Sequence, residues 1–467
     1  MKMKKLVALL TATVMTVGML SGCGSSTGDT ETAADTTTAT TEAATETESK
    51  TEAGTAEGTG FTYDENLAGV EISFLNSKGE IQTAIEDMAA AFEEETGIKV
   101  DILACGTGEV PYTKITSAYN SGTAPTMAML DTTDIVALAE EYATDLSDEE
   151  WLAECSDFVT AVNEKVYSFP FCIEGRGLIY NKAAIEDTLG TTFDPSTINS
   201  YDALSALLAD LRAAGMENPV VISKEDWSLG AHQLGFIYDT YDGTTAGATE
   251  VMSKLKDGSL QAEDYERYNE FVDTLDLLLS YNINGKDPLG ALYEQDPIFL
   301  ADGDSAIWAN GCWAWANIAE SGAESTDEYG FLPFVLGNDT TDFANTAIQA
   351  AASKQVMIDK VQASEEEVAA AKTFLNWLVY AEEGQKMLVE DAAIIPACTN
   401  NTNAPLDPLG KDIQSKMASG DTFSSSFIAP SDHWSVMGAA MQKYIAGQSS
   451  KEELAKELDK YWQSQEK

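Results

Sequence analysis

The stretch VEISFLNSKGEIQTAIEDMAAAFEEETGIKVDILA, residues 70–104, holds a strand, a helix and a second strand in succession. Its first residues alternate apolar and polar side chains, as a half-buried strand does. Apolar side chains then recur at helical spacing, at Ile81, Ile85, Met88 and Phe92. Gly97 stands where this helix would end, and residues 98–103 alternate again. This order predicts the beginning of a parallel α/β sheet.

Further along, SGTAPTMAML (121–130) predicts a loop and a third strand that ends at Asp131. VYSFPFCIEGRGLIYNK (166–182) predicts two extended pieces, interrupted at residues 174–177 by two glycines and two charges, which is typical of a crossing between lobes. VVISKEDW (220–227) predicts a strand that leads into an exposed aromatic side chain. Helices are expected at 201–214, 261–280, 364–380, 381–390 and 450–463, and residues 304–318 should form a strand, a turn and the start of a helix.

The N-terminus has the pattern of an export signal, with a basic start, an apolar run and small residues before Cys23. The ending Leu-Ser-Gly-Cys resembles a bacterial lipobox, so we expect residues 1–22 to be removed and Cys23 to carry lipid. Residues 23–60 are rich in Thr, Ala, Glu, Gly and Ser and offer little to bury, which predicts a disordered tether. The body from Phe61 on is long enough for two lobes.

The formal net charge of −50 argues against binding to nucleic acid, whose phosphates would be repelled. Five cysteines remain besides Cys23, at positions 105, 155, 172, 312 and 398. They have no CxxC spacing and cannot all pair, so we expect small buried residues rather than a disulfide framework or a zinc site. The glycines near residue 106 do not complete a dinucleotide loop, and we expect neither a metal nor a cofactor.

Six segments in order resemble the extracellular solute-binding proteins of ABC importers, in the class that takes up sugars. These are AFEEETGIKV, SGTAPTMAMLD, EGRGLIYNK, NGCWAWANI, KTFLNWLVYAEEGQKML and DHWSVMGAAMQKYIAG. Several are similar to segments of the maltose and maltodextrin binding proteins. The resemblance covers residues 61–467 and implies a two-lobed α/β fold of the periplasmic-binding-protein type, with a ligand cleft between the lobes and about three hinge crossings.

The resemblance also implies a division of the chain. The N-terminal lobe would comprise 61–172 and 350–400, and the C-terminal lobe 173–345 and 405–467. The crossings would lie near 170–175, 345–350 and 397–405.

Within NGCWAWANI, the two tryptophans are two positions apart and should face opposite ways. By resemblance Trp313 stacks on a sugar and Trp315 is core, while Gly311 would let the backbone approach a ligand closely. Cys312 replaces the family's Pro, which puts the turn in doubt. Trp434 matches another stacking position.

A second group of candidates comes from the loops at strand ends. Glu225 and Trp227 occupy the place of a Glu-Pro-Tyr motif, Glu174 matches a hydroxyl-binding Glu, and Arg176 could pair with Glu174 or bind a hydroxyl. On the first lobe, position alone indicates Asn76, Ser77 and Lys78 after the first strand, and Asp131 and Asp134 after the third. Leu130 and Asp134 depart from the maltose pattern, so we do not expect the familiar maltodextrin.

The sequence therefore predicts a monomeric receptor, held on the outer face of the cell membrane by lipid on Cys23, that delivers a sugar to ABC permease subunits by hinge closure. An oligosaccharide is the expected ligand. A peptide, a polyamine or another cationic solute is the alternative, because cations suit an acidic protein with aromatic side chains. A secreted glycosidase would need two catalytic carboxylates, which a chain with 77 acidic residues does not exclude, but no hydrolase motif supports it.

Overall fold

The computed structural model describes residues 53–55, 60–106, 109–155, 158–323 and 328–465. The expected signal peptide, Cys23 and the tether up to residue 52 lie outside the described residues. At the end of the expected tether, β1 (Ala53–Thr55) pairs antiparallel with β2 (Thr62–Asp64). The expectation of disorder as far as residue 60 is therefore wrong for these three residues, whose backbone groups are satisfied by a partner strand.

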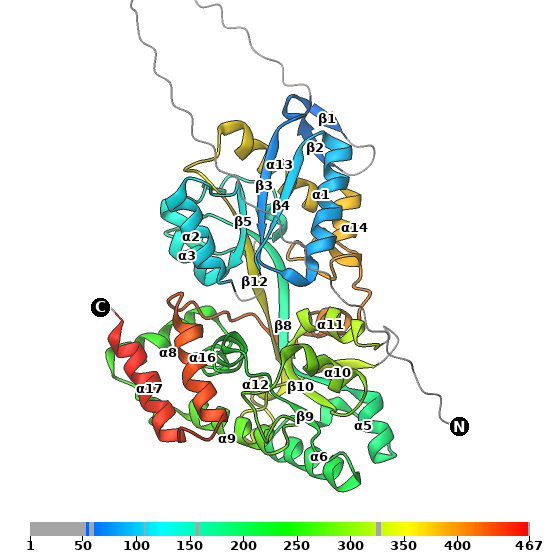
Figure 1. The fold of residues 1–467 in the computed structure, drawn as a ribbon, viewed down its shortest axis with the longest axis vertical. Helices are drawn as coiled ribbons and strands as arrows, with labels where there is room; N and C mark the ends of the chain where they lie inside the picture. The colour runs from blue at the N-terminus through cyan, green and yellow to red at the C-terminus, as the bar shows by residue number, and fades with distance from the viewer. Residues whose placement is uncertain (1–52, 56–59, 107–108, 156–157, 324–327, 466–467) are drawn as a thin grey trace, which may run out of the picture. The chain divides into compact units, whose positions relative to one another are not determined.

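A mixed sheet organises the chain from Thr51 onward (Figure 1). Among the described residues it has nine strands, in the order β4-β3-β5-β12-β8-β10-β9, with β11 beside β8 and β13 beside β12. Their bounds are β3 Glu71–Asn76, β4 Lys99–Ala104, β5 Met127–Asp131, β8 Phe169–Asn181, β9 Val220–Val221, β10 Ile307–Gly311, β11 Tyr329–Leu332, β12 Ile348–Ile358 and β13 Thr422–Phe423. The predicted parallel arrangement holds for β3, β4 and β5, whereas β12 runs antiparallel to both β5 and β8.

The first lobe is built on β3, β4 and β5. Its helices are α1 Gln82–Thr96, α2 Pro111–Ser121, α3 Thr132–Tyr142, α4 Leu152–Cys155, α13 Glu365–Tyr380 and α14 Glu382–Glu390. Helix α1 ends as predicted at Gly97, which adopts a φ of 74° and donates its N–H to Glu93 O at 2.8 Å. Phe92 packs edge-on against Phe374 and Trp377, with ring centroids 5.1 and 5.7 Å away. Segments nearly 300 residues apart therefore share one core.

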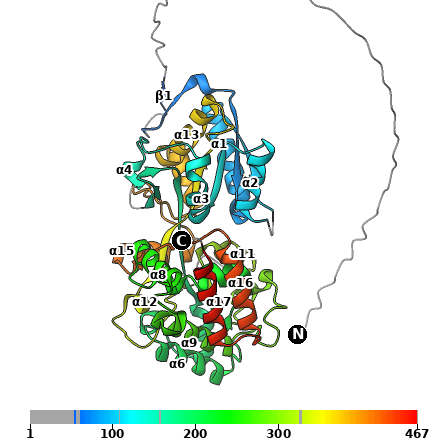
Figure 2. The same ribbon diagram turned by 90° about the vertical axis from the view of Figure 1, so that its left-hand side faces the viewer.

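The second lobe surrounds β9, β10 and β11 and contains most of the remaining helices. They are α5 Lys182–Leu189, α6 Tyr201–Ala214, α7 Phe236–Asp239, α8 Thr245–Asp257, α9 Glu266–Ser280, α10 Asp296–Ala301, α11 Trp315–Glu320, α12 Phe343–Thr346, α15 Pro408–Ser419, α16 His433–Ile445 and α17 Lys451–Ser464. Figures 1 and 2 show α16 and α17 side by side, and their apolar residues join a core with α6, α8 and α9. None of the helices in the described ranges is both long and apolar enough to cross a membrane.

Most predicted helices are confirmed, but one helix and one strand of the second lobe differ in extent from the prediction. Helix α6 matches its predicted range, but α9 begins at Glu266, because a short 3-10 helix over Ala262–Asp264 precedes it. The strand predicted over 220–227 is limited to β9, which pairs with β10 at two residues only. Trp227 is half-buried rather than exposed.

Strand β8 is continuous through the stretch that was predicted to be interrupted. Its two glycines serve close packing and not a break. A Cβ added at Gly175 would lie 2.5 Å from Ile413 Cδ1, and one added at Gly177 would lie 2.6 Å from Leu332 O. Strand β8 pairs with β12 from Phe169 to Arg176, and with β10 and β11 between Arg176 and Asn181. Figure 1 shows β8 and β12 passing together from the elements of the first lobe to those of the second.

Cys155 and Cys398 are buried as predicted, but they also form a disulfide, which the cysteine spacing did not predict. They are 243 residues apart, and the chain after α14 returns to the end of α4, where Thr399 N donates to Glu154 O at 3.0 Å. Cys172 is buried as expected, but Cys105 and Cys312 are only partly buried. No spacing rule could have identified the pair, since tertiary packing alone brings it together.

Candidate functional site

Glu174 lies on β8 where this strand runs beside β12. It is buried, and its carboxylate accepts a hydrogen bond from Ser353 Oγ and forms an ion pair with Lys78 Nζ. Lys78 follows β3, and its Nζ also lies 2.8 Å from Glu80 Oε1. Two expected site residues that are 96 positions apart are therefore in contact.

Both members of this pair are charged at neutral pH. Burial by itself would raise the pKa of Glu174, but the ammonium groups of Lys78 and Lys354 and the bond from Ser353 lower it to about 2. Burial opposes the charge on Lys78, yet Glu174 and Glu80 hold its pKa well above the usual value. The pair thus places fixed charges at the junction of the two lobes.

Asn76 and Ser77 shape the turn that presents Lys78. Asn76 is fully buried; its Oδ1 accepts the N–H of Lys78 at 2.8 Å, and its Nδ2 donates to Lys78 O and Gln82 Oε1, both at 2.9 Å. Asn76 thus stabilises the turn with three hydrogen bonds, and its expected contact with a ligand stays a prediction. Ser77 Oγ, in contrast, is buried and has no hydrogen-bond partner among the described residues.

Asp131 and Asp134 lie at the C-terminal end of β5, as expected. Asp131 Oδ1 pairs with Lys354 Nζ of β12 at 2.7 Å. Asp134 is buried in the first turn of α3, where burial and the neighbouring Asp131 raise its pKa while Lys354 opposes the rise. Leu130 beside them is fully buried, so this side of the site offers carboxylates and an ammonium group but no aromatic ring in the family's position.

Arg176 pairs with Asp239 of α7. The sequence had instead suggested Glu174 or a hydroxyl group as its partner. Both side chains are buried, and Arg176 also donates to Ala231 O at 3.2 Å. Asp239 accepts a second bond, from Ser425 Oγ at 2.7 Å. Burial raises the pKa of Asp239 to about 6 although Arg176 and Ser425 lower it. The guanidinium group therefore ties β8 to the second lobe.

Two of the expected tryptophans meet around a histidine that the sequence did not single out. The ring of His232, in the π-helical turn η5 (Ser228–Gln233), lies 4.5 Å from Trp313 and 5.3 Å from Trp227, measured between centroids. Tyr293 packs edge-on against Trp227 at 5.4 Å, and its hydroxyl accepts Asn310 Nδ2 at 3.2 Å. We refer to Trp227, His232, Tyr293 and Trp313 as the aromatic group.

The aromatic group lies within electrostatic reach of the charges described above. Burial, together with the positive charges of Arg176, Lys354 and Lys78 and against the opposing effect of Glu174, lowers the pKa of His232 to about 3. His232 is therefore neutral at pH 7, and its Nδ1 is buried without a hydrogen-bond partner among the described residues. Burial raises the pKa of the Tyr293 hydroxyl in the second lobe, and the negative charge of Glu80 in the first lobe adds to this rise.

The two tryptophans of NGCWAWANI differ as predicted in burial. Trp315 is 8% exposed and packs edge-on against Tyr329 at 5.4 Å, whereas Trp313 is only half-buried. Gly311 does not leave space for a ligand, because a Cβ added there would lie 2.2 Å from Cζ3 of Trp313. The glycine instead lets the Trp313 ring fold back over β10.

Trp434 and Glu225 lie next to η5, which carries His232. Trp434 is the second residue of α16, which packs closely on η5; a Cβ at Gly230 would lie 2.1 Å from Trp434 O. Its side chain is half-buried. Glu225 precedes η5, and its Oε2 is buried without a hydrogen-bond partner among the described residues. His433, beside Trp434, belongs to the core, where Tyr238 OH lies 2.9 Å from its Nε2.

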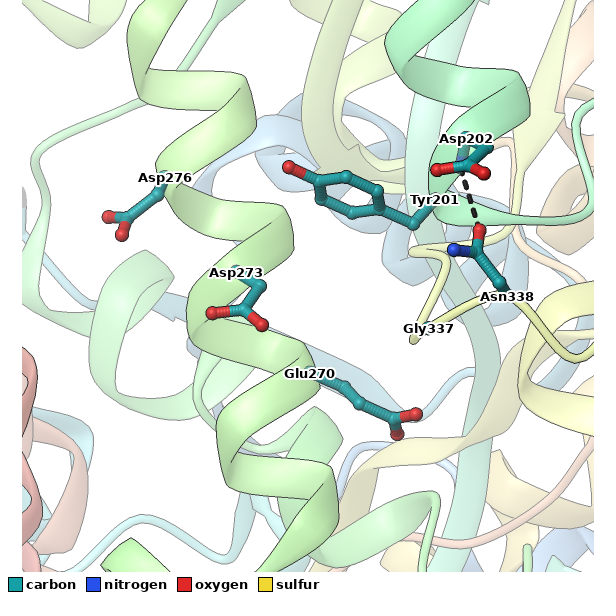
Figure 3. Close-up of a pocket in the computed structure, with 7 residues that line it drawn as sticks. All are labelled: Tyr201, Asp202, Glu270, Asp273, Asp276, Gly337 and Asn338. Carbon is teal, nitrogen blue, oxygen red and sulfur yellow. Dashed lines mark hydrogen bonds between the residues drawn. The ribbon is translucent and has the colours of Figure 1, made fainter.

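A cavity of about 440 Å³ elsewhere in the second lobe contains none of these residues (Figure 3). Its lining is Tyr201, Asp202, Glu270, Asp273, Asp276, Gly337 and Asn338. Three of its acids have partners, since Glu270 pairs with Arg267, Asp273 with Lys451, and Asp276 accepts Tyr444 OH. The lining has a single aromatic ring, that of Tyr201, so we place the candidate site at the aromatic group.

Residues 87–416 match the sequence profile of a protein family described as bacterial extracellular solute-binding protein. The chain belongs to this family. As a solute-binding protein it is a receptor and not an enzyme, which agrees with the sequence prediction and removes the glycosidase alternative.

Comparison with individual proteins gives the same fold. A multiple sugar-binding protein of Streptococcus mutans is 24% identical over 367 residues, 73% of this chain and 79% of that protein. The structure of the solute-binding protein RafE in complex with raffinose superposes with a TM-score of 0.68 at 20% identity, covering 84% of this chain and 99% of that one. A Bacillus licheniformis sugar transporter in complex with stachyose gives 0.63 at 18% identity, with 84% and 99% coverage. These similarities confirm the predicted two-lobed α/β fold.

The sequence missed His232, Tyr293 and Lys354. His232 and Tyr293 stand in segments that resemble no family motif, and Lys354 lies within a strand whose register was unknown. Only the fold brings His232 to Trp313, Tyr293 to Trp227 and Lys354 to Asp131.

Proposed function

We propose that this solute-binding protein captures an oligosaccharide outside the cell and delivers it to an ABC permease. The observation that carries the proposal is the meeting of Trp227 and Trp313 around His232, next to the charged side chains at the junction of β8 and β12. Aromatic faces suit the C–H faces of a pyranose ring, and the polar rim suits its hydroxyl groups. Ser77 and Glu225 each have a buried oxygen that could pair with a hydroxyl group.

The relatives support a carbohydrate ligand of more than one ring. The curated relative is named a multiple sugar-binding protein, and solved structures of the same fold hold raffinose and stachyose. We propose that Trp313, Trp227 and Trp434 stack on sugar rings, and that Glu174, Lys78, Asp131, Asp134, Ser77 and Glu225 line the rim. Arg176, Gly311 and Asn76 are better explained as supports for these residues.

Hinge closure would couple binding to transport. In this proposal, residues 61–172 and 350–400 form one lobe, residues 173–345 and 405–467 form the other, and the ligand binds in the cleft between them. Ligand contacts to both lobes would shift the population toward the closed form, which would dock as a monomer on the permease. Cys23 would carry the lipid that keeps the receptor on the outer face of the membrane.

A thermal-shift panel tests the ligand class. The mature chain from Cys23, produced without lipid, is heated with mono- and oligosaccharides, peptides and spermidine. A rise in melting temperature with an oligosaccharide, lost in Trp313→Ala, is the expected result, because binding to the folded state stabilises it. No shift with any saccharide would refute the proposed function. For the anchor, Cys23→Ser should release the protein from the cell surface into the medium.

A further inference from the structure

Three cationic side chains around the candidate site are already matched by carboxylates. The pairs are Lys78 with Glu80 and Glu174, Lys354 with Asp131, and Arg176 with Asp239. His232 adds no positive charge, because its imidazole is neutral at pH 7. The protein thus offers an incoming anion no free cation among these residues.

Glu225, in contrast, is an acid with one carboxylate oxygen that has no hydrogen-bond partner among the described residues. Its side chain is half-buried, and its Oε2 is shielded from solvent but accepts no hydrogen bond from any described residue. Burial raises the pKa of this carboxyl group, and the nearby acids Glu294 and Asp226 contribute to the rise, whereas a hydrogen bond from its own backbone N–H and the charge of Lys224 oppose it. The ammonium group of Lys224 is hydrogen-bonded to Ala291 O instead. A buried acceptor without a donor is destabilising, so a donor on the ligand would be favoured here.

The aromatic rings next to Glu225 suit the same kind of donor. Trp227 follows two residues later and packs edge-on against both Tyr293 and His232. Tyr293 lies within electrostatic reach of both Glu225 and Glu80. Aromatic faces attract cations, and surrounding carboxylates strengthen that attraction. A buried carboxylate oxygen without a hydrogen-bond donor and aromatic faces therefore occur together on this side of the site.

We propose that the solute is an amine-bearing saccharide, whose protonated amino group binds Glu225 and the faces of Trp227 and Tyr293. This inference rests on the proposed sugar-binding function and specifies its substrate class. Glu225 then determines specificity, since it distinguishes an amino group from a hydroxyl group at the same ring position. A neutral sugar would leave the surplus negative charge uncompensated.

Three oligosaccharides that share one β-1,4-linked glucose backbone form a matched probe set, with an amino, an acetamido or a hydroxyl group at C2. Their affinities for the unlipidated mature chain are measured by calorimetry at about pH 6, where sugar amines are protonated. Raffinose, stachyose and spermidine are measured alongside. We expect the amino form to bind about tenfold to a hundredfold more tightly than the hydroxyl form, the range for a hydrogen bond to a charged group.

Glu225→Gln keeps the size of the side chain and removes its charge. It should abolish the preference for the amino form, so that the amino and hydroxyl forms bind within about twofold of each other, well below the range above. Glu263→Gln is the matched control, since Glu263 is an exposed acid on the 3-10 helix before α9, and its removal changes the net charge equally. The control should keep the full preference, and unchanged melting temperatures of both variants would show that they are folded.

The outcomes separate this inference from the proposed function. If the hydroxyl or acetamido form, raffinose or stachyose binds as tightly as the amino form, the amine specificity is refuted and sugar binding stands. If Glu225→Gln keeps the preference, Glu225 is not its source and the inference is refuted. If spermidine binds and no saccharide does, both proposals fail in favour of a polyamine receptor, and if no probe binds, both fail outright.

Discussion

Arg176→Met offers a sharp test of how the second lobe is held together. Arg176 is 7% exposed and its partner Asp239 is fully buried, so water screens the pair very little. Removing one member of such a pair leaves the other charge buried and uncompensated, at about 3–5 kcal/mol. The variant also loses the bond to Ala231 O and the contact with the Phe236 ring, whose centroid lies 4.9 Å from the guanidinium carbon. We expect a fall of about 3–5 kcal/mol in the free energy of unfolding at pH 7.5.

The loss should depend on pH in a defined direction. The pKa of Asp239 is about 6 in the folded protein, above its usual value of 3.8, and it should rise further without Arg176. A carboxyl group whose pKa is raised by folding favours the folded state below its unfolded pKa, and this contribution is lost as the pH rises through the folded pKa. Arg176→Met should therefore destabilise less at about pH 5 than at pH 7.5. Asp239→Asn in the same background should recover much of the stability, because the amide is neutral.

Urea unfolding followed by tryptophan fluorescence measures these changes. Lys165→Met is the control, since Lys165 and Asp145 also form an ion pair, at 2.7 Å, but their side chains are 55% and 40% exposed. That substitution should change stability by at most about 1 kcal/mol. A loss for Arg176→Met as small as that of the control, or one that is the same at both pH values, would refute the reasoning.

Three further predictions concern the candidate site and the disulfide. Trp315→Ala should lower the free energy of unfolding by about 3–5 kcal/mol, as removal of a buried ring does, whereas Trp313→Ala should abolish sugar binding with a smaller loss; the reverse pattern in urea unfolding and calorimetry would contradict the assignment. Gly311→Ala should weaken binding by displacing the Trp313 ring, while an unchanged affinity would show that the ring has another place. Cys155→Ser and Cys398→Ser should each destabilise by about 2–5 kcal/mol, and thiol titration of the unfolded parent must show two additional thiols after reduction if the disulfide exists.

Local features of the sequence were sufficient wherever one short segment decides its own conformation. Helix α1 could be predicted through its last turn, because Ile85, Met88 and Phe92 share one face and Gly97 ends the helix. The different burial of Trp313 and Trp315 also followed from their spacing. Both results depend on the period of a helix or strand, which neighbouring residues fix by themselves.

Partners that are distant in the sequence required the tertiary structure. The two glycines of β8 were interpreted as a break, yet they admit Ile413 and Leu332, which no local pattern reveals. Arg176 was expected to pair with Glu174, two positions away on the same strand, or to bind a hydroxyl group, but it pairs with Asp239, 63 positions on. Which carboxylate a buried guanidinium group meets depends on how the strands and helices pack, and this packing is encoded by the whole chain.

The features of the candidate site can also be separated into those that the sequence predicted and those that required the tertiary structure. The sequence alone determined the export signal pattern, the acidic charge, the first strand-helix-strand unit and the residue types that could meet a sugar, because composition and short-range periodicity carry that information. Only the tertiary structure decided that His232 stands between Trp227 and Trp313, that Lys78 contacts Glu174, and that Cys155 bonds Cys398. Apart from the contact of His232 with Trp227, which lie in one turn, these contacts join residues from about 80 to more than 240 positions apart, and such contacts form only when the lobes fold.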